Sequence, residues 1–273
     1  MNPKNYKKPD FTSREARAMA AKAFALSPKE IRPLPGDRSQ NFLIQTKSAR
    51  KYVLKIASSF DHLEELDFEN RVILKLSREL SDYHFPLPQP DIDGQEISIQ
   101  KGQNEIFYLR LFDYVEGSSL ADLQSVPLSL WSEIGRLLAR IDLVLKDFYH
   151  AGSRRELPWD VKNVLWSKDR LKYVSDPVKK RQLDYALLQI ETHLLPVSTQ
   201  LRRQVIYGDG NEHNFILRVE KDTYRLTGLI DFGDMSESFL AAEPAIALTY
   251  ALMKASEPEE AVKTLLAAYH KIN

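Results

Sequence analysis

Residues 205–234 read VIYGDGNEHNFILRVEKDTYRLTGLIDFGD and contain two acidic motifs. The first places Asp209 and Asn214 in a D-x-x-x-x-N pattern, and the second places Asp231 after an apolar run, in Asp-Phe-Gly. Between the motifs lie two runs with β propensity and a polar turn, at residues 215–219, 224–230 and 220–222. A hairpin of this length is expected to bring Asn214 and Asp231 to the same end of a small sheet.

These three polar residues suit phosphoryl transfer, in which the protein mainly positions the reactants and neutralises charge. In such sites a loop Asp accepts the proton of the attacking hydroxyl, while an Asn and the Asp of Asp-Phe-Gly bind Mg²⁺. Asp209 fits the first role, and Asn214 and Asp231 fit the other two. Either motif alone is equally typical of an ordinary turn, but both together, one hairpin apart, favour a kinase.

The two motifs resemble the catalytic loop and the Asp-Phe-Gly of the aminoglycoside phosphotransferase and choline kinase superfamily. Within it, GDGNEHN, GLIDFGDM and AEPAIALTYALM are most similar to the hydroxylysine kinase group. The resemblance implies an α+β, bilobal protein-kinase-like fold, with an antiparallel sheet and helices in the N-lobe and a mostly helical C-lobe. The superfamily usually begins the loop with His, which anchors it, and this chain has Tyr207 there.

The composition is that of an ordinary globular protein. The chain has 273 residues, of which 43% are hydrophobic and 28% charged, with 38 basic and 38 acidic side chains. This balance gives no basic field to attract nucleic acid or an anionic membrane. Cysteine is absent, and no apolar run suits a signal peptide or a membrane span. We therefore expect a cytoplasmic protein without nucleic-acid or membrane partners.

A clean strand at residues 51–56 carries Lys55, whose side chain points away from the faces of Leu54 and Ile56. The Val-Leu-Lys-Ile pattern is typical of the strand lysine that binds nucleotide phosphates, although a solvent-facing Lys has the same pattern. The helix expected at residues 63–80 offers it a carboxylate partner. Glu69 is favoured because it matches a position that the resemblance singles out, Glu65 comes second, and simple solvation of the helix is the alternative.

The turn at residues 35–40, PGDRSQ, lies between two β-like runs. In the kinase interpretation its backbone N–H groups cover the nucleotide phosphates. It has one Gly where protein kinases have three, so an ordinary β-turn remains open. The Gln-Asn-Phe that follows resembles a segment of the hydroxylysine kinase group. The residues expected to bind the nucleotide here are Ser39, Gln40 and Asn41.

The segment after the strand at residues 105–112 reads DYVEG and matches the hinge between kinase lobes, where Asp113 and Val115 would hold the base. The expected division is an N-lobe at residues 1–112, a hinge at 113–117 and a C-lobe at 118–273. The chain ends at Asn273, on a helix that reads as mid-domain. The C-lobe is therefore expected to be truncated relative to the superfamily, as a fragment or as a naturally short form.

The resulting hypothesis is a Mg²⁺-dependent kinase that uses ATP or GTP and a small, amine-bearing hydroxyl acceptor such as 5-hydroxylysine or another amino alcohol. Two alternatives stay open: a non-catalytic nucleotide-binding pseudokinase, and an aminoglycoside 3′-phosphotransferase of the antibiotic-resistance type. Tyr207 and the glycine-poor turn support the pseudokinase, whereas the retained acidic residues and Lys55 oppose it. The six His form no H-x-x-x-H pair, which disfavours a zinc hydrolase. The sequence leaves the oligomeric state open.

Overall fold

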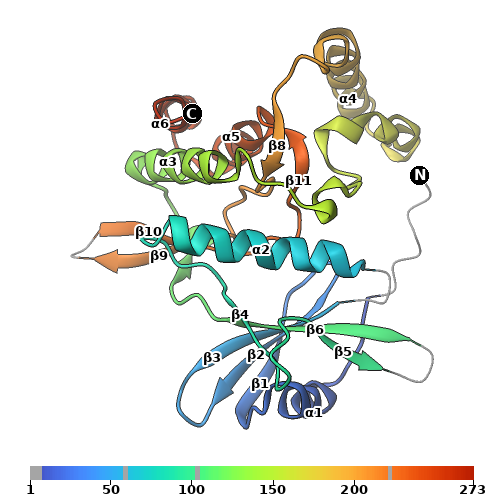
Figure 1. Ribbon diagram of the computed structural model, residues 1–273. Coiled ribbons are helices and arrows are strands. Elements are labelled where there is room, and N and C mark those ends of the chain that lie inside the picture. The colour runs from blue at the N-terminus through green and yellow to red at the C-terminus, as the bar shows by residue number, and fades with distance from the viewer. Residues whose placement is uncertain (1–7, 58–60, 102–104, 221–222) are drawn as a thin grey trace.

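The protein has two lobes, seen in a computed structural model that describes residues 8–57, 61–101, 105–220 and 223–273 (Figure 1). An antiparallel sheet with two helices forms one lobe, and helices dominate the other. The bilobal, kinase-like α+β fold expected from the sequence is confirmed. The polar turn expected at residues 220–222 lies mostly outside the described residues.

The N-lobe sheet has the strand order β1-β2-β3-β6-β4, with β5 added beside β6. Its strands are β1 (Pro28–Leu34), β2 (Gln40–Thr46), β3 (Lys51–Ala57), β4 (Pro88–Gln89), β5 (Ser98–Lys101) and β6 (Ile106–Asp113). The register places Lys55 on β3 opposite Asn41 on β2 and opposite Arg110 on β6. Directly opposed residues of antiparallel strands point to the same face. The sheet therefore presents a row of three polar side chains on one face.

Two helices cover the two faces of this sheet (Figure 1). Helix α1 (Ser13–Phe24) begins with the capping box of Thr12 and Glu15, and its Ala16, Ala20 and Phe24 pack on one face. Helix α2 (Leu63–Glu79) lies between the sheet and the C-lobe, and its apolar side chains join the C-lobe core. Because α2 shares that core, its polar side chains are fixed relative to both lobes.

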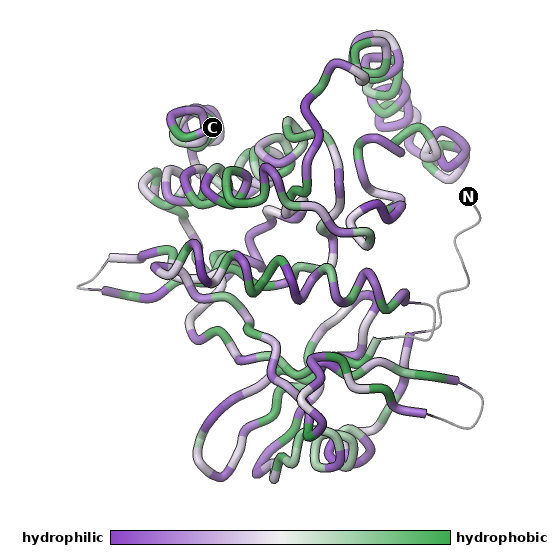
Figure 2. Tube along the Cα trace, viewed as in Figure 1, coloured by the Kyte–Doolittle hydropathy of each residue, from purple (hydrophilic) through white to green (hydrophobic). Residues whose placement is uncertain are grey.

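The C-lobe builds its core around the long helix α3 (Leu128–Leu145), whose stripe of apolar residues is fully buried. Figure 2 shows the apolar segments of this lobe gathered where the helices and strands face one another. Its other main elements are β7 (Ser118–Ser119), α4 (Pro177–Gln189), β8 (Arg203–Ile206), β9 (Phe215–Glu220), β10 (Thr223–Leu229), β11 (Ser236–Phe239), α5 (Ala242–Lys254) and α6 (Pro258–His270). Single-turn and 3₁₀ segments connect them, including the residues Ala151–Arg154 and Val161–Tyr173.

The hairpin of β9 and β10 has the arrangement that its sequence predicts. The strands pair antiparallel, with Phe215 opposite Leu229 at the open end of the hairpin, away from the turn. One residue beyond, the amide of Ile230 donates to the carbonyl of Asn214 at 3.0 Å. The expectation that Asn214 and Asp231 meet at one end of a small sheet is therefore confirmed. Strand β7 adds to this sheet beside β9.

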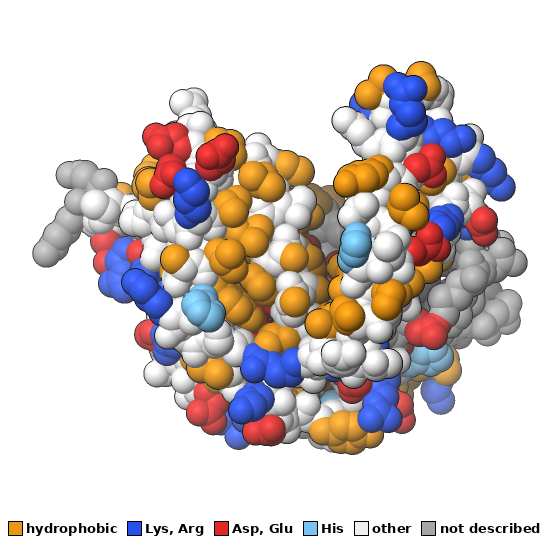
Figure 3. Space-filling view, turned by 90° about the horizontal axis from the view of Figure 1, so that it is seen from above, with side chains coloured by type: hydrophobic (Ala, Val, Ile, Leu, Met, Phe, Trp, Pro, Cys, Tyr) orange, Lys and Arg blue, Asp and Glu red, His pale blue; other side chains and the backbone are white. Residues whose placement is uncertain are grey.

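The outer surface of the C-lobe is hollowed between the main body and the segment that carries α4, and hydrophobic side chains gather near the hollow (Figure 3). Large apolar side chains that stay exposed include Tyr185 and Leu188 on α4 and Leu252 and Met253 on α5. Among the described residues, no helix is both long enough and apolar enough to cross a membrane. The apolar residues of this lobe are thus divided between a packed core and a partly open surface.

Candidate active site

Tyr207 anchors the loop that follows β8. Its side chain is fully buried, its hydroxyl donates to the carbonyl of Ile230 at 2.6 Å, and its ring meets that of Phe232 edge to face with 5.3 Å between centroids. Ile230 and Phe232 flank Asp231 in the chain. Tyr207 therefore ties the two acidic motifs together, in the position where the superfamily usually has His.

Replacing Tyr207 with Phe keeps the ring packing but leaves the carbonyl of Ile230 without this donor. A buried carbonyl that loses its partner costs about 1–3 kcal/mol. We expect Tyr207→Phe to lower the free energy of unfolding by this amount in urea denaturation. Tyr185→Phe, on the exposed face of α4, is the matched control. Equal stabilities of the Tyr207 and Tyr185 variants would contradict the anchoring role.

Asp209 lies in the loop after Tyr207 and is held by two amides. Its carboxylate accepts from Asn211 at 2.8 Å and from Asn214 at 2.7 Å, and Asn214 also donates to the backbone carbonyl of Asp209 at 3.1 Å. Burial raises the pKa of Asp209, and the bonds from Asn211 and Asn214 act against this rise. The carboxylate is thus fixed in direction and more basic than an exposed Asp.

Asp231 follows β10 in a left-handed backbone conformation, with φ of 59°. Its side chain is half exposed, and its carboxylate pairs with the ammonium of Lys55 at 3.1 Å. The positive charge of Lys55 is the main cause of the lowered pKa of Asp231. Its effect outweighs that of burial, which acts to raise this pKa. Asp231 therefore stays ionised at neutral pH and joins the N-lobe sheet to the C-lobe hairpin.

Glu69 does not take Lys55 as its partner, so the sequence expectation is corrected here. Its buried carboxylate pairs instead with Arg110 at 2.8 Å and with Arg155 at 3.1 Å. Burial acts to raise the pKa of Glu69, but these guanidinium groups outweigh it and lower the pKa. Two arginines satisfy a buried carboxylate better than one flexible lysine. A sequence signal existed, because Arg110 interrupts the apolar strand EIFYLRLF.

Side chains alternate in direction from the turn between β1 and β2 into the start of β2. The hydroxyl of Ser39 donates to the side chain of Asn41 at 2.9 Å, and Asn41 donates to the carbonyl of Pro35 at 3.0 Å. The side chain of Gln40 exchanges hydrogen bonds of 2.7 and 2.8 Å with the backbone of Phe11. Gln40 therefore points to the opposite side from its neighbours. Its side chain bonds to the N-terminal segment, and the expected contact of Gln40 with a nucleotide stays a prediction about its backbone.

Asp113 and Val115, the two residues expected at the hinge, make their contacts away from the cavity between the lobes. The carboxylate of Asp113 accepts from Gln89 at 3.0 Å, and burial raises its pKa. Val115 is buried, and its side chain packs against Gly228 of β10. The described residues that line the cavity include neither Asp113 nor Val115. Their expected contact with a base stays a prediction about the backbone of this segment.

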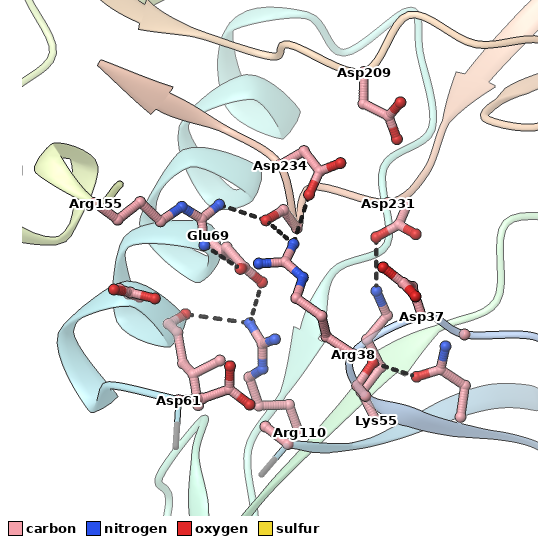
Figure 4. A pocket seen from close by; sticks show the side chains of 17 residues that line it. Asp37, Arg38, Lys55, Asp61, Glu69, Arg110, Arg155, Asp209, Asp231 and Asp234 are labelled. Carbon is pink, nitrogen blue, oxygen red and sulfur yellow. Dashed lines mark hydrogen bonds and ion pairs between the residues drawn. The ribbon is translucent and has the colours of Figure 1, made fainter. Parts of the chain in front are cut away.

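A cavity of about 170 Å³ opens between the lobes (Figure 4). It brings together Ser39, Asn41, Lys55, Glu69, Asp209 and Asp231, which the sequence singles out, and also Arg38, Arg110, Arg155 and Asp234. Asn214 reaches it through its bond to Asp209. Burial raises the pKa of Asp234 to about 6, against the effect of Arg38. Asp234 follows Asp-Phe-Gly directly, so the motif itself pointed to this residue.

The described residues contain no group of three or more His, Asp or Glu side chains arranged to enclose a metal ion. Mg²⁺ does not need such a group, because it is usually bound through one or two carboxylates, with phosphate oxygens and waters completing the shell. Asp231 and the amide of Asn214 offer hard oxygen donors of the right kind at one end of the hairpin. The donor set therefore fits a magnesium ion that is shared with a phosphate.

Glu243, at the start of α5, fixes the beginning of the loop that follows β8 and carries Asp209. Its buried carboxylate accepts from the amides of Tyr207 at 2.6 Å and Gly208 at 3.1 Å. Burial raises the pKa of Glu243 to about 7, with the two amide bonds acting against the rise. Nearby, buried Asp142 accepts from the hydroxyl of Tyr269 at 2.5 Å, and its pKa is also raised well above normal by burial and by Glu243.

The raised pKa values of Glu243 and Asp142 predict how the stability of the fold changes with pH. Because the pKa of Glu243 is higher in the folded than in the unfolded chain, the folded state holds a proton that the unfolded state releases between pH 4.5 and about 7. Stability should therefore fall as pH rises through this window, by up to about 3 kcal/mol.

Urea denaturation at pH 5 and pH 8 measures the effect, and Glu243→Gln should reduce the difference between the two stabilities. The substitution also removes the effect of Glu243 on the pKa of Asp142, so the difference between the two chains reports the coupled pair. The same pH dependence in both proteins would contradict the assignment.

Comparisons with known proteins agree with this geometry. The model of the phosphotransferase enzyme family matches residues 30–273. Hydroxylysine kinase of Mus musculus is 27% identical over 289 residues, which cover 97% of this chain and 76% of that protein, and hydroxylysine kinase of Danio rerio is 23% identical over 281 residues, covering 97% and 77%.

Solved structures show the same fold. An amicoumacin kinase in complex with AMP-PNP and Ca²⁺ aligns with a TM-score of 0.71 at 18% identity, covering 96% of this chain and 78% of that one. A microcompartment-associated aminopropanol kinase aligns with a TM-score of 0.71 at 16% identity, covering 96% and 81%. The match of the family model over nearly the whole chain decides the assignment: this protein belongs to the phosphotransferase enzyme family.

Proposed function

We propose that the protein transfers the γ-phosphoryl group of ATP or GTP to a hydroxyl of a small, amine-bearing metabolite such as 5-hydroxylysine. The observation that carries this proposal is the meeting of Lys55, Asp209 and Asp231 at one interlobe cavity, with Asn214 bonded to Asp209. The similarity to hydroxylysine kinases and to an aminopropanol kinase supports an amino-alcohol acceptor.

In this proposal Asp209 orients the acceptor hydroxyl and takes its proton as the oxygen attacks the γ-phosphorus. A new oxygen–phosphorus bond forms, the bond to the β-phosphate oxygen breaks, and the nucleoside diphosphate leaves with the electron pair. Burial makes Asp209 more basic, and the amides of Asn211 and Asn214 hold its direction. Lys55 binds phosphate oxygens, and Asp231 and Asn214 hold Mg²⁺. When bound, that ion neutralises charge on the phosphates.

The lobes are proposed to divide as the sequence suggests, at residues 1–112, 113–117 and 118–273. Strand β6 of the N-lobe sheet ends at Asp113, and β7, which pairs with β9 of the C-lobe, begins at Ser118. Between them Gly117 adopts φ of 147°, a conformation open to glycine alone. We also propose a cytoplasmic location, which the absence of cysteine supports.

A phosphoryl-transfer screen tests the function. The purified chain is incubated with Mg²⁺ and γ-labelled ATP or GTP, together with 5-hydroxylysine, 1-amino-2-propanol, choline, homoserine or kanamycin. We expect label on an amino alcohol, at a rate above that of nucleotide hydrolysis in water. Nucleotide binding without transfer to any acceptor would instead support a non-catalytic module. Transfer to kanamycin alone would support a resistance enzyme.

A further inference from the structure

The guanidinium of Arg38 reaches across from the N-lobe and is held by groups of the C-lobe. Arg38 comes from the N-lobe turn, yet it donates to the carboxylate of Asp234 at 2.6 Å and to the carbonyl of Gly233 at 2.5 Å. It also lies over the ring of Trp159, 5.3 Å from the centroid. A carboxylate, a carbonyl and an indole face together bind ammonium and guanidinium groups well. These three groups, from Asp234, Gly233 and Trp159, belong to the C-lobe.

Asp234 stands at the border between two hollows of the molecule. It lines the interlobe cavity together with Asp209 and Asp231. It also lines a smaller cavity of about 20 Å³, whose walls include Trp159 and Gly208. Figure 4 shows its carboxylate between Arg38 and Asp209. A molecule that presents a hydroxyl to Asp209 would therefore carry a nearby amine toward Asp234.

Arg38 also lies close to the place where phosphates are expected. A β-carbon added at Gly233 would lie 3.1 Å from the Arg38 guanidinium and 3.4 Å from the Asp231 carboxylate. Both groups therefore approach the same point of the backbone. A phosphate chain beside Asp231 carries more negative charge than Asp234 and has several acceptor oxygens. Arginine forms strong, often bidentate bonds to phosphate, so the phosphate competes with Asp234 for Arg38.

We propose that Asp234 and Trp159 form the ammonium site for the acceptor, and that Arg38 fills this site until a nucleotide phosphate draws it away. This inference rests on the proposed function and deepens it. Nucleotide binding then opens the amine site, so that the acceptor binds after the nucleotide. The coupling must be reciprocal, because each ligand raises the affinity for the other by the same factor. Without an acceptor, the opened amine site does not assist hydrolysis of the nucleotide by water.

Calorimetry tests the coupling, using as probe the acceptor with the highest turnover in the transfer screen. For the unaltered protein, we expect Mg²⁺ and AMP-PNP to tighten acceptor binding by about tenfold or more. Arg38→Gln should bind the acceptor tightly without nucleotide, so that the coupling disappears. Arg32→Gln, an exposed position on β1, is the matched control and should keep the coupling.

Steady-state kinetics test the site itself. Asp234→Asn should raise KM for the acceptor by about tenfold or more, while KM for the nucleotide stays within a few-fold. If Arg38 only stabilised the contact between the lobes, Arg38→Gln would lower the melting temperature and leave the coupling between nucleotide and acceptor binding intact. That result, or an unchanged acceptor KM in Asp234→Asn, would overturn the inference while turnover still upholds the proposed function. A screen without transfer to any acceptor would overturn both.

Discussion

Replacing Asp209 with alanine is expected to lower kcat by about 10²–10⁴-fold, the usual contribution of a positioned general base. Nucleotide affinity should change by no more than a few-fold, because we propose that Lys55 and Asp231 serve the phosphates, whereas Asp209 faces the acceptor hydroxyl. Steady-state kinetics on the acceptor identified in the screen, beside calorimetric binding of nucleotide, measures both effects.

Two comparisons make this result specific. Asp184→Ala removes an exposed carboxylate from α4 and should leave turnover unchanged. Asn211→Ala removes one hydrogen bond to Asp209 but keeps the carboxylate, so it should cost much less than the Asp209 change. Melting temperatures show whether the loop stays folded. Near-normal turnover of Asp209→Ala would remove the loop from catalysis, and the interpretation of residues 205–234 would be wrong.

The parts of the site that the sequence predicts are the local ones. Asn214 and Asp231 flank the two ends of one hairpin, and Asp209 lies five residues before Asn214 in the preceding loop. The pairing of the hairpin strands brings these short segments together without help from distant parts of the chain. Lys55 likewise follows from its strand, because the flanking Leu54 and Ile56 are buried on the other face. The capping box at Thr12 and Glu15 is equally local.

The parts that the sequence does not predict depend on contacts between distant segments. Arg155 meets Glu69 across 86 positions of the chain, and Arg38 meets Asp234 across 196. No periodicity or spacing reports such pairs. Lys55 was the expected partner of Glu69, because the strand of Lys55 and the helix of Glu69 were the two segments with recognisable patterns. The buried arginine of an apolar strand was the signal that a different partner was present.

These distant contacts explain why the lobes are held in register. Arg155 bonds to Glu69 on α2 and also to the carbonyls of Gly233 at 2.6 Å and Met235 at 2.7 Å. One guanidinium therefore links α2 to the segment after Asp-Phe-Gly. Protein kinases place a Lys–Glu pair at this point. Here the lysine is left to pair with Asp231, and an arginine of the C-lobe holds the helix.

Asp231→Asn is expected to abolish the Mg²⁺-dependent part of nucleotide binding and to lower turnover by at least about a hundredfold. The neutral amide loses the charge that suits it to a metal ion between phosphates. Asn tolerates the left-handed backbone that Asp231 adopts, with φ of 59°. The substitution therefore changes the charge with little strain on the fold.

Thermal denaturation with and without Mg²⁺ separates the metal effect from the loss of the partner of Lys55. Nucleotide at about a hundred times its Kd should stabilise the unaltered protein by about 2.7 kcal/mol. In the variant, the stabilisation by nucleotide with Mg²⁺ should fall to the value measured without Mg²⁺, because the carboxylate proposed to bind the metal is gone. If only the bond to Lys55 mattered, the variant would lose stabilisation equally in both conditions. Asp184→Asn is the matched control, and a full Mg²⁺-dependent shift in Asp231→Asn would remove that residue from the metal site.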